Sequence, residues 1–189
     1  MKKRVGVVHT FLYSVEDIKK QFREKLPEID VINIIDDSLL QEALENKGIT
    51  PDIVHRMCVY FRICEDLGCA CILNQCSSVG EAADIAARQV NIPVLKIDYP
   101  MAKKAVELGS RIAVIATAIS TVGPSSRLIE NVAREAGKEV KVERYYVEGA
   151  YDCLLKTGDR DKHNEMVIEK IKEAEKANDV IVLAQGSMY

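Results

Sequence analysis

The sequence contains two copies of the same short patterns. The stretch RVGVVHT at 4–10 returns as RIAVIAT at 111–117, and ILNQCSS at 72–78 returns as VLAQGSM at 182–188. The offsets are 107 residues (from position 4 to position 111) and 110 residues (from position 75 to position 185). Two matches at nearly one offset indicate two related half-domains, each with a strand end of the same design. At the second offset, Cys76 of the first copy corresponds to Gly186 of the second.

Short runs rich in Val and Ile alternate with longer stretches of helical periodicity. The predicted strands are 5–9, 30–35, 69–73, 94–97, 111–116, 140–145 and 180–183, and the predicted helices are 14–26, 51–67, 78–88, 101–108, 125–136 and 163–177. Strands that alternate with helices favour parallel sheets with both faces covered. We therefore predict an α/β fold of two pseudo-symmetric lobes, residues 1–98 and 99–189, each a parallel β-sheet flanked by helices.

Short sequence motifs predict where helices begin, and a polar segment predicts where the chain is mobile. Two residue pairs have the spacing of capping boxes, Ser14 with Asp17 and Ser78 with Glu81. Pro124 is expected near the first turn of its helix. The polar segment 148–162 is expected to form a mobile cover. A doubly wound design should continue into another helix after strand 180–183, so an end at Tyr189 predicts that the C-terminal helix of the fold is absent.

The composition argues against several classes of function. The chain has 189 residues, of which 48% are hydrophobic and 29% charged, and its formal net charge is −3. This charge gives no electrostatic reason to expect nucleic acid or an anionic membrane as a partner. No apolar run approaches the roughly 20 residues of a membrane span, and the basic N-terminus precedes too short an apolar run for a signal peptide. We expect a cytoplasmic protein.

The six cysteines are expected to be reduced, because the chain carries no export signal. Four of them lie at spacings C-x4-C-x-C-x4-C, which lack the paired C-x2-C of structural zinc sites: Cys64, Cys69, Cys71 and Cys76. Buried thiols that act as small hydrophobic side chains explain Cys58, Cys64, Cys69 and Cys71 more simply. We predict no metal site.

Cys76 is the cysteine whose position in the sequence indicates a catalytic role. In open parallel sheets the ligand lies outside the carboxyl ends of the strands, and Cys76 stands between a predicted strand and a predicted helix. The positive end of a helix dipole at such a place favours the thiolate. The hydroxyls of Ser77 and Ser78, with the free N–H groups of the helix start, form a natural carboxylate cradle. The alternative is a buried structural thiol.

Other polar residues at predicted strand ends are further candidates. Thr117, Ser120 and Thr121 form a hydroxyl-rich turn before a helix, which serves either as an N-cap or as an anion contact. His9 ends a buried strand beside Thr10, where a histidine is either a satisfied core residue or a catalytic group.

The absence of several common motifs argues against some classes of enzyme. The sequence contains no G-x-G-x-x-G, no P-loop and no G-x-S-x-G, which argues against nucleotide enzymes and serine hydrolases. The other two histidines, His55 and His163, lie on predicted helices and are expected at the surface.

Taken together, these features resemble the aspartate/glutamate/hydantoin racemase superfamily. The closest matches are NQCSSVGE at 74–81 and the stretch 116–124, and the resemblance covers essentially the whole chain. It implies an active site in the cleft between the lobes and no cofactor. It also implies proton transfer at the α-carbon of a carboxylate substrate by two thiols, because inversion needs an acid or base on each face.

The resemblance implies roles for individual residues. Cys76 matches the first-lobe thiol, and His9 with Thr10 matches a polar pair that tunes it. Gly186 stands at the position of the second thiol, for which Cys153 substitutes only if its segment folds over the site. The expected catalytic residues are Cys76 and His9, and the expected substrate-binding residues are Thr10, Asn74, Ser77, Ser78, Thr117, Ser120, Thr121, Gly186 and Ser187.

A single thiol leaves several reactions open. We expect a cofactor-independent racemase-like isomerase acting at the α-carbon of a small carboxylate, an amino acid or a hydantoin-like compound. A one-thiol lyase that decarboxylates a malonate-like acid and an enzyme resembling maleate isomerase are alternatives. A non-catalytic carboxylate-binding protein and a redox-sensing thiol cluster are alternatives of other classes. The expected partners are the small carboxylate and, through apolar faces, a second copy in a homodimer.

Overall fold

The structure is a computed structural model that describes residues 3–188, apart from the side chain of Tyr13. The chain divides into two compact units, Met1–Ile97 and Asp98–Tyr189. Each unit is built around a parallel sheet with helices packed on it, so the predicted α/β fold is confirmed.

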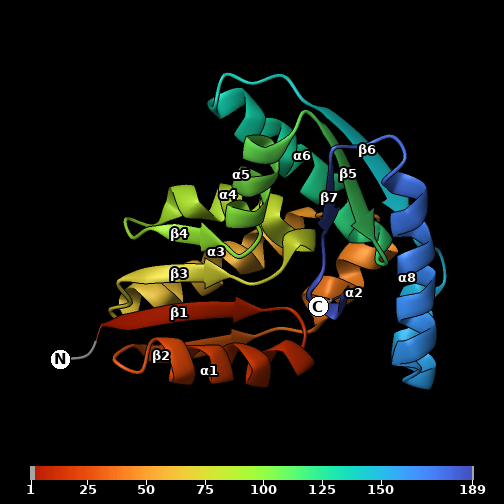
Figure 1. The fold of residues 1–189 in the computed structure, drawn as a ribbon. Coiled ribbons are helices and arrows are strands. Elements are labelled where there is room, and N and C mark those ends of the chain that lie inside the picture. The colour runs from red at the N-terminus through yellow and green to blue at the C-terminus, as the bar shows by residue number, and fades with distance from the viewer. Residues whose placement is uncertain (1–2, 189) are drawn as a thin grey trace. The chain divides into compact units, whose positions relative to one another are not determined.

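The first unit contains a four-stranded parallel sheet of order β2-β1-β3-β4. Its strands are β1 (Arg4–His9), β2 (Asp30–Ile35), β3 (Cys71–Asn74) and β4 (Val94–Lys96). Its helices are α1 (Tyr13–Lys25), α2 (Ser38–Glu45), α3 (Pro51–Asp66) and α4 (Gly80–Ala86), with 3₁₀ turns at Ser77–Val79 and Ala87–Gln89. Helix α1 packs on one face of this sheet, and α3 with α4 covers the other (Figure 1).

The second unit repeats the arrangement with a three-stranded parallel sheet of order β6-β5-β7. Its strands are β5 (Arg111–Ala116), β6 (Lys141–Tyr146) and β7 (Val180–Leu183). Its helices are α5 (Tyr99–Leu108), α6 (Ile119–Glu135), α7 (Ala150–Asp152) and α8 (Arg160–Ala174), with a π-helical turn at Cys153–Thr157 and a 3₁₀ turn at Gly186–Met188. Helices α5 and α6 cover one face, and α8 lies along the other (Figure 1).

Helix α3 ends in close contact with β1. Gly68 adopts a positive φ of 72°, and the chain turns back with Cys69 N–H bonded to Cys64 C=O at 3.1 Å and Gly68 N–H to Glu65 C=O at 2.9 Å. This Schellman arrangement satisfies the last carbonyls of the helix. It also places Cys64 against Gly6, where an added Cβ would lie 2.4 Å from the Cys64 sulfur.

Two predicted helix starts are wrong. Helix α1 begins at Tyr13, and the Ser14 hydroxyl donates to Phe11 C=O at 2.7 Å, so Ser14 is not the capping residue. Helix α6 begins at Ile119, six residues before its predicted start, so Pro124 lies inside the helix and not at its first turn.

The structure corrects the prediction at two further helices. Helix α2 was not anticipated, because its eight residues are too short to show a clear period. Helix α8 begins at Arg160, after Asp159, whose side chain accepts from Lys162 N–H. His163 on α8 is fully buried and not at the surface as predicted. No helix within residues 3–188 combines the length and apolarity needed to cross a membrane.

Candidate active site

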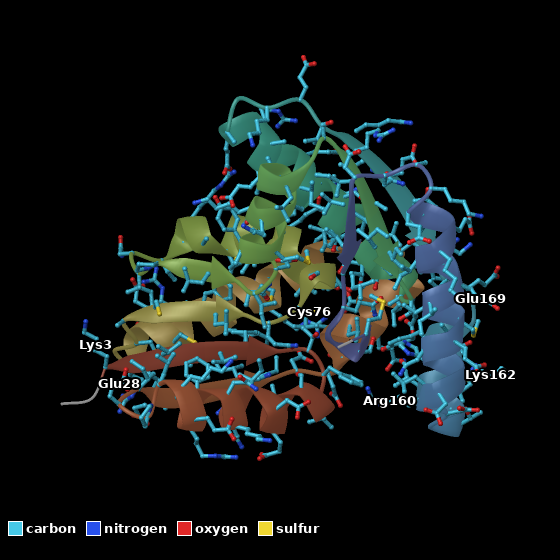
Figure 2. The ribbon with its side chains drawn as sticks, viewed as in Figure 1. Lys3, Glu28, Cys76, Arg160, Lys162 and Glu169 are labelled. Carbon is cyan, nitrogen blue, oxygen red and sulfur yellow. The ribbon has the colours of Figure 1, made fainter. Side chains whose placement is uncertain are left out.

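Cys76 lies two residues beyond the carboxyl end of β3 (Figure 2). It is half-buried and packs against the edge of the core between the sheet and α3. The long helix predicted from Ser78 is instead a 3₁₀ turn followed by the seven residues of α4, and Cys76 is the residue that precedes this turn. Ser77 is half-buried and Ser78 is buried in the same turn. The sequence therefore places the thiol at the strand end correctly, but in front of a shorter helix than predicted.

Asn74 holds the turn that carries Cys76. Its side-chain Nδ2 donates to the backbone carbonyl of Cys76 at 2.9 Å. Because a carbonyl can only accept, this bond fixes the amide with its oxygen, Oδ1, on the other side. That oxygen is buried and has no hydrogen-bond partner among the residues that the structure describes. Asn74 therefore presents an unused acceptor two residues before Cys76.

Thr10 and Gln75 also have a buried side-chain oxygen without a hydrogen-bond partner among the described residues. Val8 pairs directly with Asn74, so their side chains point to the same face of the sheet, and Thr10 follows two residues after Val8. Thr10 is 1% exposed, and its hydroxyl is unpartnered within residues 3–188, as is the side-chain oxygen of Gln75. We call Thr10, Asn74 and Gln75, which lie at or just beyond the ends of the paired strands β1 and β3, the strand-end polar cluster. Buried polar atoms are rarely left without a partner, so each of these three oxygens is a candidate for contact with a ligand or water.

His9 points to the opposite face of the sheet. Asn33 pairs with Val7, so it shares a face with His9, and His9 Nε2 lies 2.9 Å from Asn33 Oδ1. The His9 side chain is fully buried, and this burial lowers its pKa. The bond to Asn33 acts in the other direction, and the positive charge of Lys19 lowers the pKa further. His9 is therefore a neutral imidazole, held away from the face that carries Asn74.

The strand pairing shows which residue of the second unit corresponds to Cys76. Asn74 pairs with Val8 in the first sheet, and Leu183 pairs with Ile115 in the second. The next residue donates its N–H to the same partner strand in both units, Gln75 to Val8 C=O at 3.2 Å and Ala184 to Ile115 C=O at 3.0 Å. Two residues beyond each pair stand Cys76 and Gln185.

The counterpart of Cys76 is therefore Gln185 and not Gly186, as the sequence offset had indicated. The strand pairing relates β3 to β7 by an offset one residue shorter than the offset that the repeated sequence motif indicates. The alignment of Gln75 with Gln185 rested only on the Gln-x-Ser motif that occurs in both copies. Gly186 is exposed, and an added Cβ there would meet no atom within 4 Å.

Gln185 is anchored by the turn between β5 and α6. Its side-chain oxygen accepts from Thr117 N–H at 2.6 Å, from Ala118 N–H at 2.9 Å and from the Thr117 hydroxyl at 3.2 Å. Backbone N–H groups only donate, so the atom that they meet must be the carbonyl oxygen of the amide. Thr117, predicted as a carboxylate contact, thus holds a side chain of its own unit.

The other hydroxyls predicted in the second unit are buried. Ser120 and Thr121 lie in the first turn of α6 and are 1% and 3% exposed. The Ser187 hydroxyl oxygen is buried and finds no partner in the described part of the chain, and neither does the hydroxyl of Ser125 on α6. Within residues 3–188, no group of three or more His, Cys, Asp or Glu side chains is placed to hold a metal ion.

Sequence reasoning missed Asn33, Gln75 and Gln185. For the two glutamines the signal was present, since the repeat placed a glutamine at the end of both strands. An amide is neither an acid nor a base near neutral pH, but it both donates and accepts hydrogen bonds and can therefore bind a ligand. Asn33 gave no sequence signal, because its bond to His9 depends on the pairing of β1 with β2.

Comparisons with known proteins agree with this architecture. The model of a family described as Asp/Glu/Hydantoin racemase matches residues 11–189. A putative Asp/Glu racemase from Yersinia pestis has a similar structure, with a TM-score of 0.70 and 13% identity over 98% of this chain and 86% of that one. A glutamate racemase isoform from Bacillus anthracis has a TM-score of 0.64 and 19% identity over 97% of this chain and 69% of that one. No functionally curated protein matches the sequence significantly.

An aspartate racemase homologue from Pyrococcus horikoshii is also similar, with a TM-score of 0.63 and 17% identity over 100% of this chain and 87% of that one. At these low identities the solved structures show a shared fold. The family match rests on the sequence itself and spans both units.

Proposed function

The chain belongs to the Asp/Glu/hydantoin racemase family, and from that premise we propose that it acts at the α-carbon of a small carboxylate with Cys76 as its acid–base thiol. Membership makes it a racemase-type enzyme. The finer proposal is that the substrate is an amino acid or a hydantoin-like compound and that no cofactor takes part. Ser77 and Ser78, in the same turn as Cys76, are proposed to contact the substrate.

The observation that carries the assignment is the strand-end position of Cys76, directly after two residues with unused buried acceptors, Asn74 and Gln75. Three other cysteines of the first unit, Cys64, Cys69 and Cys71, are poorly suited to proton transfer. Burial raises the pKa of Cys64 to about 12, and it also raises the pKa of Cys69 and of Cys71. Cys76 instead stands at the carboxyl end of a parallel strand, the edge at which ligands of such sheets bind.

The strand-end polar cluster supports a substrate that donates hydrogen bonds. The fixed amide of Asn74 leaves its buried oxygen without a donor, and the Thr10 hydroxyl can accept as well as donate. The ammonium group of an amino acid and the ring N–H of a hydantoin both supply such donors. A malonate-like acid supplies none once it is ionised. The cluster therefore favours the nitrogen-bearing substrates over the decarboxylation alternative.

The proposed step is a proton transfer on one face of the α-carbon. The Cys76 thiolate takes the α-proton, and the electron pair of the C–H bond is delocalised into the adjacent carbonyl group as an enolate. Return of a proton from the Cys76 thiol to the same carbon restores the substrate. Gln185, at the corresponding position of the second unit, is neither an acid nor a base near neutral pH. Exchange on the face of Cys76 should therefore be faster than inversion.

The test is solvent deuterium exchange. The two enantiomers of aspartate, of glutamate and of 5-methylhydantoin are incubated in D₂O, with loss of the α-proton followed by NMR and inversion by polarimetry. We expect exchange to outpace inversion, and Cys76→Ala to slow exchange about 10²- to 10⁴-fold, the usual contribution of a positioned acid or base. The control is Cys58→Ala, which removes another half-buried thiol from α3.

Two results would count against the proposal. Exchange that continues in Cys76→Ala would remove the thiol from the mechanism, and inversion as fast as exchange would require a second acid–base group. The one-thiol lyase is the second candidate, because Gln185 and not a thiol corresponds to Cys76. Release of CO₂ from methylmalonate, without exchange on any amino acid, would favour that candidate.

A further inference from the structure

We propose that Gln185 is a substrate-binding residue, which donates hydrogen bonds from its side-chain Nε2 to the carboxylate of the substrate. This inference rests on the proposed function, because it takes the small carboxylate as the ligand. It assigns a binding role to the residue that stands where the first unit has its thiol.

The position of Gln185 is the first support. It lies two residues beyond the carboxyl end of β7, as Cys76 lies two residues beyond the carboxyl end of β3. The carboxyl edge of a parallel sheet is where its ligands bind. Gln185 is half-buried, so its side chain is neither sealed in the core nor free in solvent.

The orientation of the amide is the second support. Three donors converge on the oxygen of Gln185, two from the backbone and one from Thr117. The amide is planar, so fixing its oxygen also fixes the direction of its two Nε2 protons. No residue among 3–188 accepts a hydrogen bond from Nε2 in the structure. A preorganised donor pair without an acceptor is suited to an anion.

The surroundings of Gln185 are the third support. The next residue is Gly186, where an added Cβ would meet no heavy atom within 4 Å, so the side of the turn is open. The residue after it, Ser187, has a buried hydroxyl without a partner in the described chain. An amide NH₂ and a hydroxyl together provide the donors that the two oxygens of a carboxylate need.

This arrangement also explains what happens to the cradle predicted at Thr117. Its backbone and hydroxyl donors are engaged by Gln185 and so do not meet a ligand directly. Their hold on the amide oxygen polarises the amide, which strengthens the Nε2 protons as donors. Thr117 is therefore a positioning residue, and Gln185 makes the contact.

The decisive variant is Gln185→Glu, because it separates the two roles of the side chain. A carboxylate at this position can still accept from Thr117 and Ala118, so the fold should keep its melting temperature. It has no proton to donate, and its charge repels an anion. Binding of L-aspartate and L-glutamate, measured by calorimetry, should weaken about 10- to 100-fold, the effect of losing hydrogen bonds to a charged group.

Two further variants complete the design. Gln21→Glu makes the same change of charge at an exposed position of α1 and should leave both affinities unchanged. Gln185→Leu removes the acceptor as well, so it should lower the melting temperature in addition to the affinity. In the parent protein, the side-chain NH₂ resonances of Gln185 should shift when either acid is added.

The proposal is overturned if Gln185→Glu binds both acids within about twofold of the parent, or if the NH₂ resonances of Gln185 stay unmoved at every concentration of the two acids. Failure of the proposed function would look different, because α-proton exchange would then survive in Cys76→Ala whatever the affinity of the Gln185 variants.

Discussion

At the scale of single residues, burial decides how His9 titrates. Its pKa is lowered below the usual value of about 6.5, chiefly because the buried ring resists a charge, while the unfolded chain keeps the usual value. As the pH falls below about 6.5, the unfolded chain takes up a proton that the folded chain does not. The unfolded state is then favoured, so the stability conferred by the neutral ring is present above this pH and is lost below it.

We therefore predict that the protein loses stability between pH 6.5 and pH 5 because of His9. Urea unfolding at pH 8, 6.5 and 5 measures the free energy of unfolding for the parent and for His9→Gln, which does not titrate. The parent should lose more free energy over the acidic interval than the variant. Equal losses would show that His9 is not responsible.

The same residue shows what sequence reasoning can decide about a site. The strand pattern correctly placed His9 at a strand end, but the alternatives of core residue and catalytic group stayed open. The pairing of Val7 with Asn33 places His9 and Asn33 on one face, while Asn74 lies on the other. Side chains of a strand alternate between faces, so the direction of each depends on the tertiary register.

At the scale of elements, the end of α3 depends on a glycine in the neighbouring strand. An added Cβ at Gly6 would lie 2.4 Å from the Cys64 sulfur and 2.9 Å from the Cys64 Cβ, with the Cys69 sulfur 3.5 Å away. Cys64 is fully buried, so neither the helix nor the strand can shift freely. The strand and the helix therefore approach as closely as the absence of a side chain permits.

We predict that Gly6→Ala destabilises the protein by about 1–3 kcal/mol, the usual cost of overpacking a core. Chemical denaturation measures the change. Gly48→Ala is the matched control, because an added Cβ there would meet nothing within 4 Å. A Gly6→Ala variant as stable as the Gly48→Ala variant would contradict this account of the contact.

The limits of the elements were predictable to different degrees. The cores of the strands follow directly from runs of Val and Ile, and all seven predicted strands are present. The start of α6 was placed too late because Pro124 was read as a start signal, although the helix begins at Ile119 and contains that proline. Proline is disfavoured inside a helix but does not exclude one, and here the helix continues through Pro124.

At the scale of the whole molecule, the six thiols should differ in accessibility. Cys64 and Cys69 are 0% and 4% exposed, and burial raises the pKa of both. A thiol reacts through its thiolate, so both burial and a raised pKa slow its reaction. Cys76 and Cys153 are only partly buried, one in each unit.

We predict that iodoacetamide labels Cys76 and Cys153 in the native protein, while Cys64 and Cys69 react only when the first unit unfolds. Mass spectrometry of peptides along a urea series gives the order of labelling. The protection of Cys64 should then disappear together with the far-UV circular dichroism signal. Labelling of Cys64 without urea, at the rate of Cys76, would show that the core opens locally.

The sequence alone determined the strands, the alternation with helices, the repeat in two units and the strand-end position of Cys76, because these follow from hydrophobic periodicity and short motifs. Only the tertiary structure decided that Gln185 and not Gly186 corresponds to Cys76, that His9 faces away from Asn74, and that the donors of Thr117 are already engaged. The physical reason is that all three depend on contacts between segments far apart in the sequence: the pairing of β1 with β2 and β3, the pairing of β5 with β7, and the bonds from Thr117 to Gln185.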